Sequence, residues 1–132
     1  MSEGPARSIA GRGVPARTSP PKPRPRDPSE LRAARWYRRR GYRVLDANVW
    51  VGGYELDLVV RRGRVLAFCE VKAKRGCGFG DPLEMVTPEK ARRVRAAAAA
   101  WLRARPELRG LDFRFDVIVE RAGRLEHIGG AF

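Results

Sequence analysis

The chain has 132 residues with 28 Lys or Arg and 15 Asp or Glu, so its formal net charge is +13. This length fits one domain, and a hydrophobic fraction of 43% can form a core, which excludes disorder from end to end. No apolar run approaches the roughly 20 residues of a membrane span, and the N-terminus shows no secretory signal, so we expect a cytoplasmic protein with no membrane partner. The basic charge favours nucleic acid as the partner, with a generally basic proteome as the alternative explanation.

The cysteine and histidine content restricts the choice of metal. Two cysteines, Cys69 and Cys77, and one histidine, His127, cannot supply a disulfide framework, a four-thiolate zinc site or a His-rich centre. Any metal would be held mainly by carboxylates, which suit Mg²⁺ or Mn²⁺. We interpret Cys69 as a core residue and His127 as incidental.

The first 28 residues differ in composition from the rest of the chain. They contain seven of the ten prolines, together with Gly, Ser and Arg, and almost no bulky apolar residue. Such a segment cannot bury enough surface to offset the entropy of ordering. We therefore expect a disordered Pro/Arg-rich tail at 1–28 and a folded domain at 29–132. The tail is either a phosphate-binding arm or inert.

The expected elements begin with a helix that starts at Pro28-Ser29-Glu30, has Ser29 as its N-cap, and ends at Gly41. Strands are expected at residues 42–51, 54–60 and 65–71. The sequence of the third, VLAFCEV, is nearly all apolar and is typical of a central strand covered on both faces. These three strands should form a meander.

A second long helix is expected from Thr87-Pro88-Glu89, with Thr87 as the N-cap, and Pro106 ends it. Alternating residues at 113–120 predict a further strand, and the turn at 121–124 leads into a short last strand at 125–128. The order α-β-β-β-α-β-β predicts a small α/β domain with a mixed sheet flanked by helices.

Charged residues interrupt the apolar pattern on the second and third strands. Glu55 and Asp57 share one face of the second strand, and Glu70 and Lys72 share one face of the third. Pairing around the turn between these strands places Asp57 across from residues 70–72. A charged side chain beside a buried strand costs free energy unless it forms an ion pair or takes part in binding or catalysis. These residues therefore form either a structural ion pair or a reactive site.

The chemistry of this group suits phosphodiester hydrolysis. Two carboxylates can hold Mg²⁺ or Mn²⁺, and the metal polarises a phosphodiester and lowers the pKa of a bound water. A lysine can orient that water or stabilise the charge that develops on the phosphate. Asp57, Glu70 and Lys72 are therefore candidate catalytic residues, and Asp57 and Glu70 are candidate metal ligands.

Motifs in a fixed order extend this pattern along the chain. They are Glu30, Ala33-Ala34, residues 38–45, residues 55–59, Glu70-Val71-Lys72, Phe79-Gly80, Pro82, Thr87, Lys90 and residues 114–117. This set resembles the PD-(D/E)XK nuclease superfamily, which has the restriction-endonuclease-like fold, and more closely the UPF0102 (YraN-like) family. The sequence departs from the pattern at Leu56, where the superfamily has proline, and at Tyr54, where the family often has glycine.

The resemblance implies a restriction-endonuclease-like sheet flanked by helices, with a metal site. It implies that Asp57 is the first acid of the superfamily pattern, Glu70 the second, and Lys72 the lysine. Glu30 matches a helix glutamate that helps to complete the metal site in archaeal Holliday-junction resolvases of similar layout. The other interpretation of Glu30 is a favourable interaction with the helix dipole.

Further residues are candidates around this site. Basic side chains expected to contact a nucleic-acid backbone are Arg38, Arg39, Arg40, Lys74, Lys90 and Arg93, although a solvated face explains them equally well. Glu55 either supports the metal ligands from outside or pairs with Arg61 or Arg43. Trp50 is the best candidate for an exposed tryptophan that stacks on bases.

Two functions of different classes follow. The first is a Mg²⁺- or Mn²⁺-dependent nuclease acting on DNA, including branched or damaged structures. The second is a nucleic-acid-binding module of nuclease fold without useful catalysis. DNA is favoured over RNA as the partner, and analogy with resolvase-like enzymes adds a homodimer to the expectation.

Overall fold

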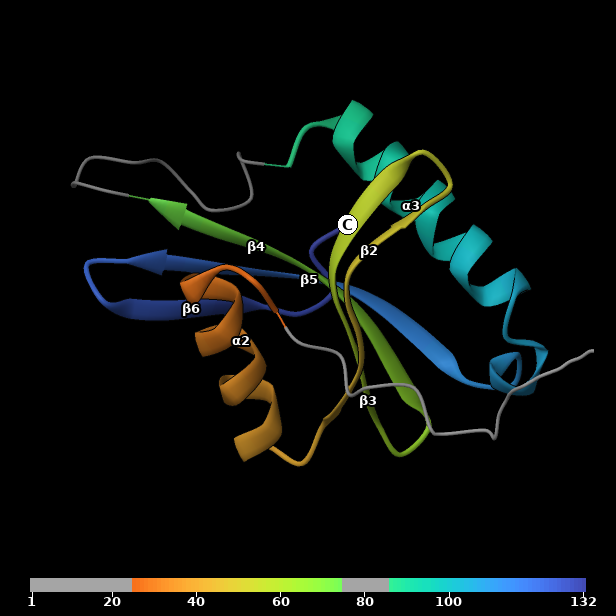
Figure 1. The fold of residues 1–132 in the computed structure, drawn as a ribbon, viewed down its shortest axis with the longest axis horizontal. Helices are drawn as coiled ribbons and strands as arrows, with labels where there is room; N and C mark the ends of the chain where they lie inside the picture. Colours follow the sequence, from red (N-terminus) through yellow and green to blue (C-terminus); the bar gives the residue numbers. More distant parts are fainter. Residues whose placement is uncertain (1–24, 75–85) are drawn as a thin grey trace, which may run out of the picture.

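The computed structural model describes residues 25–74 and 86–132, and Figure 1 shows their arrangement. Most of the predicted tail, the predicted loop at 76–85 and Cys77 lie outside these residues. The elements are, in chain order, α2 (Pro28–Arg39), β2 (Arg43–Val51), β3 (Tyr54–Arg62), β4 (Val65–Lys74), α3 (Pro88–Arg103), a 3₁₀ turn (Pro106–Leu108), β5 (Asp112–Arg121) and β6 (Arg124–Ile128). This order confirms the predicted α-β-β-β-α-β-β sequence of helices and strands.

The strands form one five-stranded mixed sheet in the order β2-β3-β4-β5-β6. The pairs β2–β3, β3–β4 and β5–β6 are antiparallel, whereas β4 and β5 run parallel. A parallel pair needs a long crossover connection, and the segment that contains α3 provides it. The apolar stretch predicted as a central strand is β4, which lies in the middle of the sheet.

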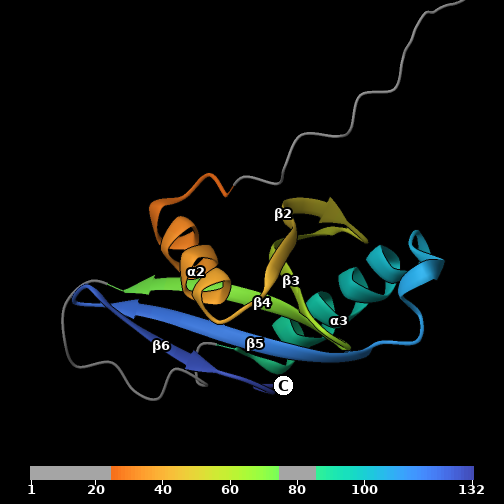
Figure 2. The same cartoon turned by 90° about the horizontal axis from the view of Figure 1, so that it is seen from below.

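The two helices cover opposite faces of the sheet. Cys69 and Val71 of β4 belong to the core cluster that includes Ala33 and Tyr37 of α2, whereas Phe68 belongs to the cluster around α3. Because successive side chains of a strand point to opposite faces, this division places one helix on each side. Figure 2 shows that α2 lies over β4 and β5 on the face of the sheet that it covers. The predicted mixed sheet flanked by helices is confirmed.

The start of α2 differs from its prediction. Asp27 is the N-cap, and its Oδ1 accepts hydrogen bonds from Ser29 N at 2.8 Å and from the Ser29 hydroxyl. Pro28 occupies the first helical position, where its fixed φ angle is favourable, so the cap falls one residue before it. The prediction of Ser29 as the N-cap is wrong. Thr87 caps α3 as predicted, with its Oγ1 3.1 Å from Lys90 N.

The hairpin that joins β2 to β3 rests on the alanine-rich face of α3. Gly52 in this turn has a φ angle of +60°, and a Cβ placed on it would lie 3.1 Å from Ala97 Cα and 3.2 Å from the Ala96 carbonyl oxygen. Only glycine fits both this backbone conformation and this distance. Neither helix that the structure describes is long and apolar enough to cross a membrane.

Candidate functional site

Asp57 of β3 and Glu70 of β4 lie side by side in the sheet. Leu58 pairs with Cys69 at the end of the β3–β4 register, so Asp57 and Glu70 are the next residues along these two antiparallel strands. The backbone N–H of Val71 donates a hydrogen bond to Asp57 Oδ2 at 2.9 Å. The predicted approach of Asp57 to residues 70–72 is therefore confirmed.

The Glu70 carboxylate is buried and only partly satisfied. Glu70 is 2% exposed, and the Tyr54 hydroxyl donates a hydrogen bond to its Oε1 at 2.8 Å. The other oxygen, Oε2, is buried and has no hydrogen-bond partner among the described residues. Burying a charged oxygen without a partner is costly, so Glu70 Oε2 is suited to an additional cationic or donor ligand.

Burial also changes the protonation of both acids. Burial, and next the charge of Glu70, raise the pKa of Asp57 to about 7 against the lowering effect of the Val71 N–H. Burial raises the pKa of Glu70 as well, opposed by the Tyr54 hydroxyl and by the nearby lysines. Two neighbouring carboxylates repel each other when both are charged. A cation bound between or beside them relieves this repulsion, so the pair favours cation binding.

Two lysines accompany the acids. Lys72 lies two residues beyond Glu70 on β4, and its charge lowers the pKa of both Asp57 and Glu70. Lys90 lies in the first turn of α3; burial and next the proximity of Lys72 lower the pKa of Lys90 to about 8. Lys90 interacts with both acids electrostatically, so it belongs to this site.

Glu30 reaches the same site from the start of α2. It is 9% exposed, and the side-chain amide of Asn48 donates to its Oε1 at 2.8 Å. The charge of Glu30 contributes to the raised pKa of Asp57 and of Glu70, which shows that the three carboxylates interact. The site therefore combines α2, β3 and β4, with α3 adding a lysine.

The donor set fits a hard divalent cation, because carboxylate oxygens suit Mg²⁺ and Mn²⁺. The unpartnered Glu70 Oε2 is the observation that supports a cation here. Within residues 25–74 and 86–132, however, no three acidic, His or Cys side chains are arranged as a complete set of metal ligands. Asp57 and Glu70 are the adjacent pair, and Glu30 is the third acid within electrostatic reach.

The other predicted site residues form different contacts. Glu55 lines the same hollow as Glu30 and Asn48, and it pairs with Arg26, whose Nη2 is 2.5 Å from Glu55 Oε2, and not with Arg61 or Arg43. Arg38 and Arg39 are in the last turn of α2, at the opposite end of this 12-residue helix from Glu30. The site does not include these helix arginines.

The remaining residues predicted to contact phosphate lie in different parts of the fold. Arg40 lies over the Trp36 ring, with its guanidinium carbon 3.8 Å from the ring centre. Arg93 pairs with Glu89 at 3.0 Å on the exposed face of α3. Lys74 is the last residue of β4, and its side chain lies outside the described part. Trp50 is 72% exposed, as predicted.

A separate buried network surrounds Asp116 of β5, which is 0% exposed. Arg114 Nε donates to Asp116 Oδ1 at 2.7 Å, and His127 Nε2 lies 2.9 Å from Oδ2. The Tyr37 hydroxyl of α2 donates to the same Oδ2 at 2.7 Å. The interpretation of His127 as incidental is therefore wrong, because it helps to connect α2 to β5 and β6. Its ring also packs against Trp36, with ring centres 4.3 Å apart.

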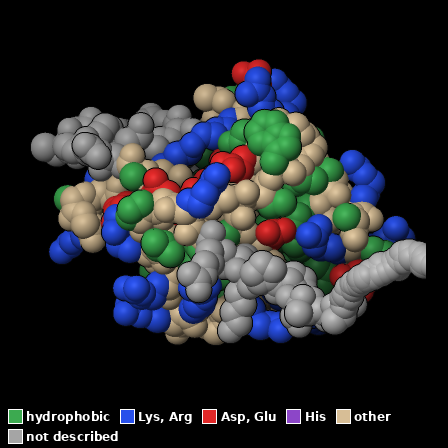
Figure 3. All heavy atoms as spheres, viewed as in Figure 1, with side chains coloured by type: hydrophobic (Ala, Val, Ile, Leu, Met, Phe, Trp, Pro, Cys, Tyr) green, Lys and Arg blue, Asp and Glu red, His purple; other side chains and the backbone are tan. Residues whose placement is uncertain are grey.

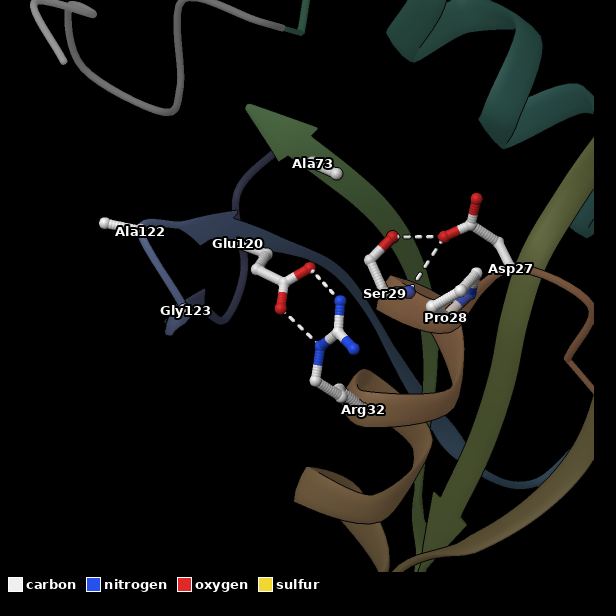
Figure 4. A pocket seen from close by; sticks show the side chains of 8 residues that line it. All are labelled: Asp27, Pro28, Ser29, Arg32, Ala73, Glu120, Ala122 and Gly123. Carbon is white, nitrogen blue, oxygen red and sulfur yellow. Dashed lines mark hydrogen bonds and ion pairs between the residues drawn. The ribbon is translucent and has the colours of Figure 1, made fainter. Parts of the chain in front are cut away.

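A cavity of about 590 Å³ opens beside the start of α2 and the end of β4. Figure 4 shows that Arg32 forms a two-pronged ion pair with Glu120 there, and that Asp27 is occupied by capping Ser29. Its charged groups are thus already paired with one another. On the face shown in Figure 3, the acidic side chains are flanked by Lys and Arg.

Two site features were not predicted from the sequence: the hydrogen bonds of Asn48 and Tyr54 to two of the acids. Lys90, a predicted contact for substrate held at the site, interacts with the acids. For Tyr54, its position three residues before Asp57 on the same expected strand was the available signal. Asn48 is a polar residue inside an expected strand, and that was its only signal.

Fold and site together define an α/β domain with a mixed sheet and an acidic pair, the half-buried Asp57 and the buried Glu70, accompanied by two lysines. The model of the uncharacterised protein family UPF0102 matches residues 29–119, and the chain belongs to this family. It is 43% identical over 105 residues to a UPF0102 protein of Geobacter sulfurreducens, covering 76% of this chain and 81% of the relative. A UPF0102 protein of Klebsiella pneumoniae is 36% identical over 107 residues, covering 80% and 84%. One from Acidothermus cellulolyticus is 40% identical over 115 residues, covering 76% and 86%.

Proposed function

We propose that this protein is a metal-dependent nuclease that hydrolyses phosphodiester bonds in DNA, including branched or damaged structures. The observation that supports it best is the buried Glu70 with its unpartnered Oε2, next to the half-buried Asp57 on the neighbouring strand. Such a pair destabilises a fold unless it binds something, and two neighbouring lysines suit an anionic substrate. The resemblance to PD-(D/E)XK nucleases supports the same chemistry.

In this proposal the acids hold the metal and the lysines hold the phosphate. Asp57 and Glu70 bind Mg²⁺ or Mn²⁺, and Glu30 contributes from α2. When bound, such an ion supplies Lewis-acid polarisation and a water of lowered pKa. Tyr54 keeps Glu70 oriented through its hydrogen bond to Oε1, which leaves Oε2 for the metal.

Lys72 and Lys90 act on the substrate in this proposal. Their ammonium groups donate to non-bridging phosphate oxygens, where negative charge grows during hydrolysis. Lys90 has a pKa lowered to about 8 by burial and by Lys72, so an approaching phosphate favours its charged form. The net charge of +13 adds attraction that does not depend on DNA sequence.

A cleavage panel tests this function. Wild type and Asp57→Asn are incubated with single-stranded, duplex, flapped and four-way-junction DNA in Mg²⁺, Mn²⁺ or EDTA. The matched control is Asp112→Asn, which removes an exposed carboxylate at the start of β5. We expect cleavage that requires metal, disappears in Asp57→Asn and persists in Asp112→Asn. Equal cleavage by wild type and Asp57→Asn would contradict the proposal.

The alternative is a nucleic-acid-binding module of the same fold without useful catalysis. The observation that favours it is that the described residues do not form a complete set of three metal ligands. Tight, salt-sensitive DNA binding without cleavage of any substrate would support this alternative. An RNA competitor that displaces DNA would redirect the proposal to RNA.

A further inference from the structure

We propose that Asn48 is a positioning residue that holds Glu30 within electrostatic reach of Asp57 and Glu70 and so strengthens cation binding at this pair. This inference rests on the proposed metal site of the nuclease function. Asn48 contacts none of the reacting groups in that proposal, and its effect passes through the Glu30 carboxylate. The relevant contact is the 2.8 Å hydrogen bond from Asn48 Nδ2 to Glu30 Oε1.

The backbone places Asn48 at the centre of the site. Its neighbours Ala47 and Val49 pair with Leu58 and Leu56, so Asn48 falls opposite Asp57 in the β2–β3 register. Its φ angle is +50°, and among the described non-glycine residues only Ala122 shares a positive φ. Asparagine tolerates this left-handed conformation better than most residues, but the conformation still costs free energy. Such a strained residue in the middle of a strand is most often retained for a local contact.

A second hydrogen bond fixes the orientation of the Asn48 amide. The backbone N–H of Arg26 donates to Asn48 Oδ1 at 3.0 Å, which leaves the Nδ2 donors for Glu30. The reversed amide would place Oδ1 against the Glu30 carboxylate and Nδ2 against the Arg26 N–H. Both contacts would then be repulsive, so the observed orientation is the only favourable one.

The Asn48–Glu30 hydrogen bond offsets the repulsion among the three carboxylates of the site. Glu30 is repelled by Asp57 and Glu70, and without a local donor it would move toward solvent. The Asn48 amide holds Glu30 in place without adding a positive charge that would compete with the cation. A neutral donor is suited to this task, as are the hydrogen-bonding partners that orient ligands in known metal sites.

The test measures Mn²⁺ affinity by titration calorimetry on the full chain, without DNA. Asn48→Gly removes the amide but still allows a positive φ angle, so it separates the hydrogen bond from the backbone conformation. We expect about tenfold weaker Mn²⁺ binding for Asn48→Gly. In a Glu30→Gln background the same change should weaken binding no further, because Asn48 acts through Glu30.

A second pair of variants leaves Asn48 itself in place. Arg26→Pro removes the N–H that orients the amide, and Arg26→Ala keeps that N–H while removing the side-chain ion pair with Glu55. We expect about threefold weaker Mn²⁺ binding for Arg26→Pro than for Arg26→Ala. This comparison decides the inference if Asn48→Gly does not fold.

The outcomes separate this inference from the proposed function. If Mn²⁺ binds, the Asn48 effect depends on Glu30 and no DNA is cleaved, the positioning role stands and the nuclease proposal fails. If wild type cleaves DNA but Asn48→Gly binds Mn²⁺ as wild type does, the positioning role is overturned and the nuclease stands. Effects of Asn48→Gly and Glu30→Gln that simply add, or no Mn²⁺ binding by wild type, would also overturn it.

Discussion

Two aspartates, the half-buried Asp57 and the buried Asp116, show how neighbouring donors decide the role of a carboxylate. Burial and the adjacent Glu70 raise the pKa of Asp57 to about 7. Burial acts on Asp116 in the same direction, yet the hydrogen bonds from His127 and Arg114 hold its pKa well below the usual range. Asp116 is thus a satisfied charge that stabilises the fold, whereas Asp57 is a poorly stabilised charge that is available for binding.

Replacing Asp57 should therefore stabilise the metal-free protein. We expect Asp57→Asn to raise the free energy of unfolding by about 1–2 kcal/mol at pH 8 in EDTA, because it removes the repulsion from Glu70. Denaturant titration followed by circular dichroism measures this difference. Added Mn²⁺ should stabilise wild type and leave the variant unchanged. A variant less stable than wild type in EDTA would show that Asp57 is a structural residue.

Asp116→Asn should have the opposite effect. We expect a loss of about 3 kcal/mol at pH 7, because the amide cannot accept from Arg114, Tyr37 and His127 as the carboxylate does. The folded-state pKa of Asp116 is lowered, so its contribution is full above the unfolded value near 4 and is lost as the pH falls below it.

The pH dependence of unfolding tests whether the stabilisation by Asp116 is lost as the pH falls. The stability difference between wild type and Asp116→Asn should be constant from pH 6 to 8 and shrink below about pH 4. The exposed Asp112→Asn change at the start of the same strand serves as the control. A difference that grew on acidification would exclude a charged Asp116 in the folded protein.

At the level of elements, the β2–β3 turn depends on its packing against α3. Gly52 and Gly53 both have positive φ angles, of +60° and +79°, but only Gly52 lies against the helix. A Cβ on Gly53 would meet nothing within 4 Å. The two glycines therefore separate the cost of the backbone conformation from the cost of packing.

Alanine at each glycine measures the two costs. We expect Gly53→Ala to lower the free energy of unfolding by about 1 kcal/mol, which is the cost of a left-handed alanine. Gly52→Ala should lower it by about 2–4 kcal/mol, because its Cβ also meets the backbone of α3. Equal losses in urea titrations of the two variants would mean that the turn moves away from α3 at little cost.

Local patterns in the sequence predicted the elements and the central pair of acids. Alternation along two strands and one short turn suffice to place Asp57 opposite Glu70, because both depend on residues close together in the chain. The contacts of Asn48 with Glu30 and of His127 with Trp36 depend on how α2 docks on the sheet. No short-range pattern encodes that docking, so the sequence does not predict these contacts. The arginines at 38–40 were placed at the site because their charge was visible but the direction of α2 was not.

At the scale of the whole molecule, charge spreads well beyond the acids. Residues 1–24 carry five basic residues and one acidic residue, so the remaining chain is still strongly basic. Attraction of a basic surface to DNA comes largely from counterion release, which makes affinity fall steeply with salt. If the chain binds DNA as proposed, the tail and the domain should each contribute in proportion to the phosphates that they neutralise.

Removal of residues 1–24 should separate the contribution of the tail to DNA affinity from that of the domain. We expect weaker DNA binding at low salt and a less steep dependence of log affinity on log salt concentration, by about 0.9 for each phosphate that the tail neutralises. Fluorescence anisotropy with a labelled duplex from 50 to 300 mM KCl measures the slope. An unchanged slope would assign all phosphate binding to residues 25–132.

The site joins Glu30 of α2 to Asp57 of β3 and Glu70 of β4, two neighbouring strands that one short turn connects. The Tyr37–Asp116 hydrogen bond ties α2 to the sheet. In the proposed function, partial opening that releases α2 would remove Glu30 from the site, while the hairpin that carries Asp57 and Glu70 persists.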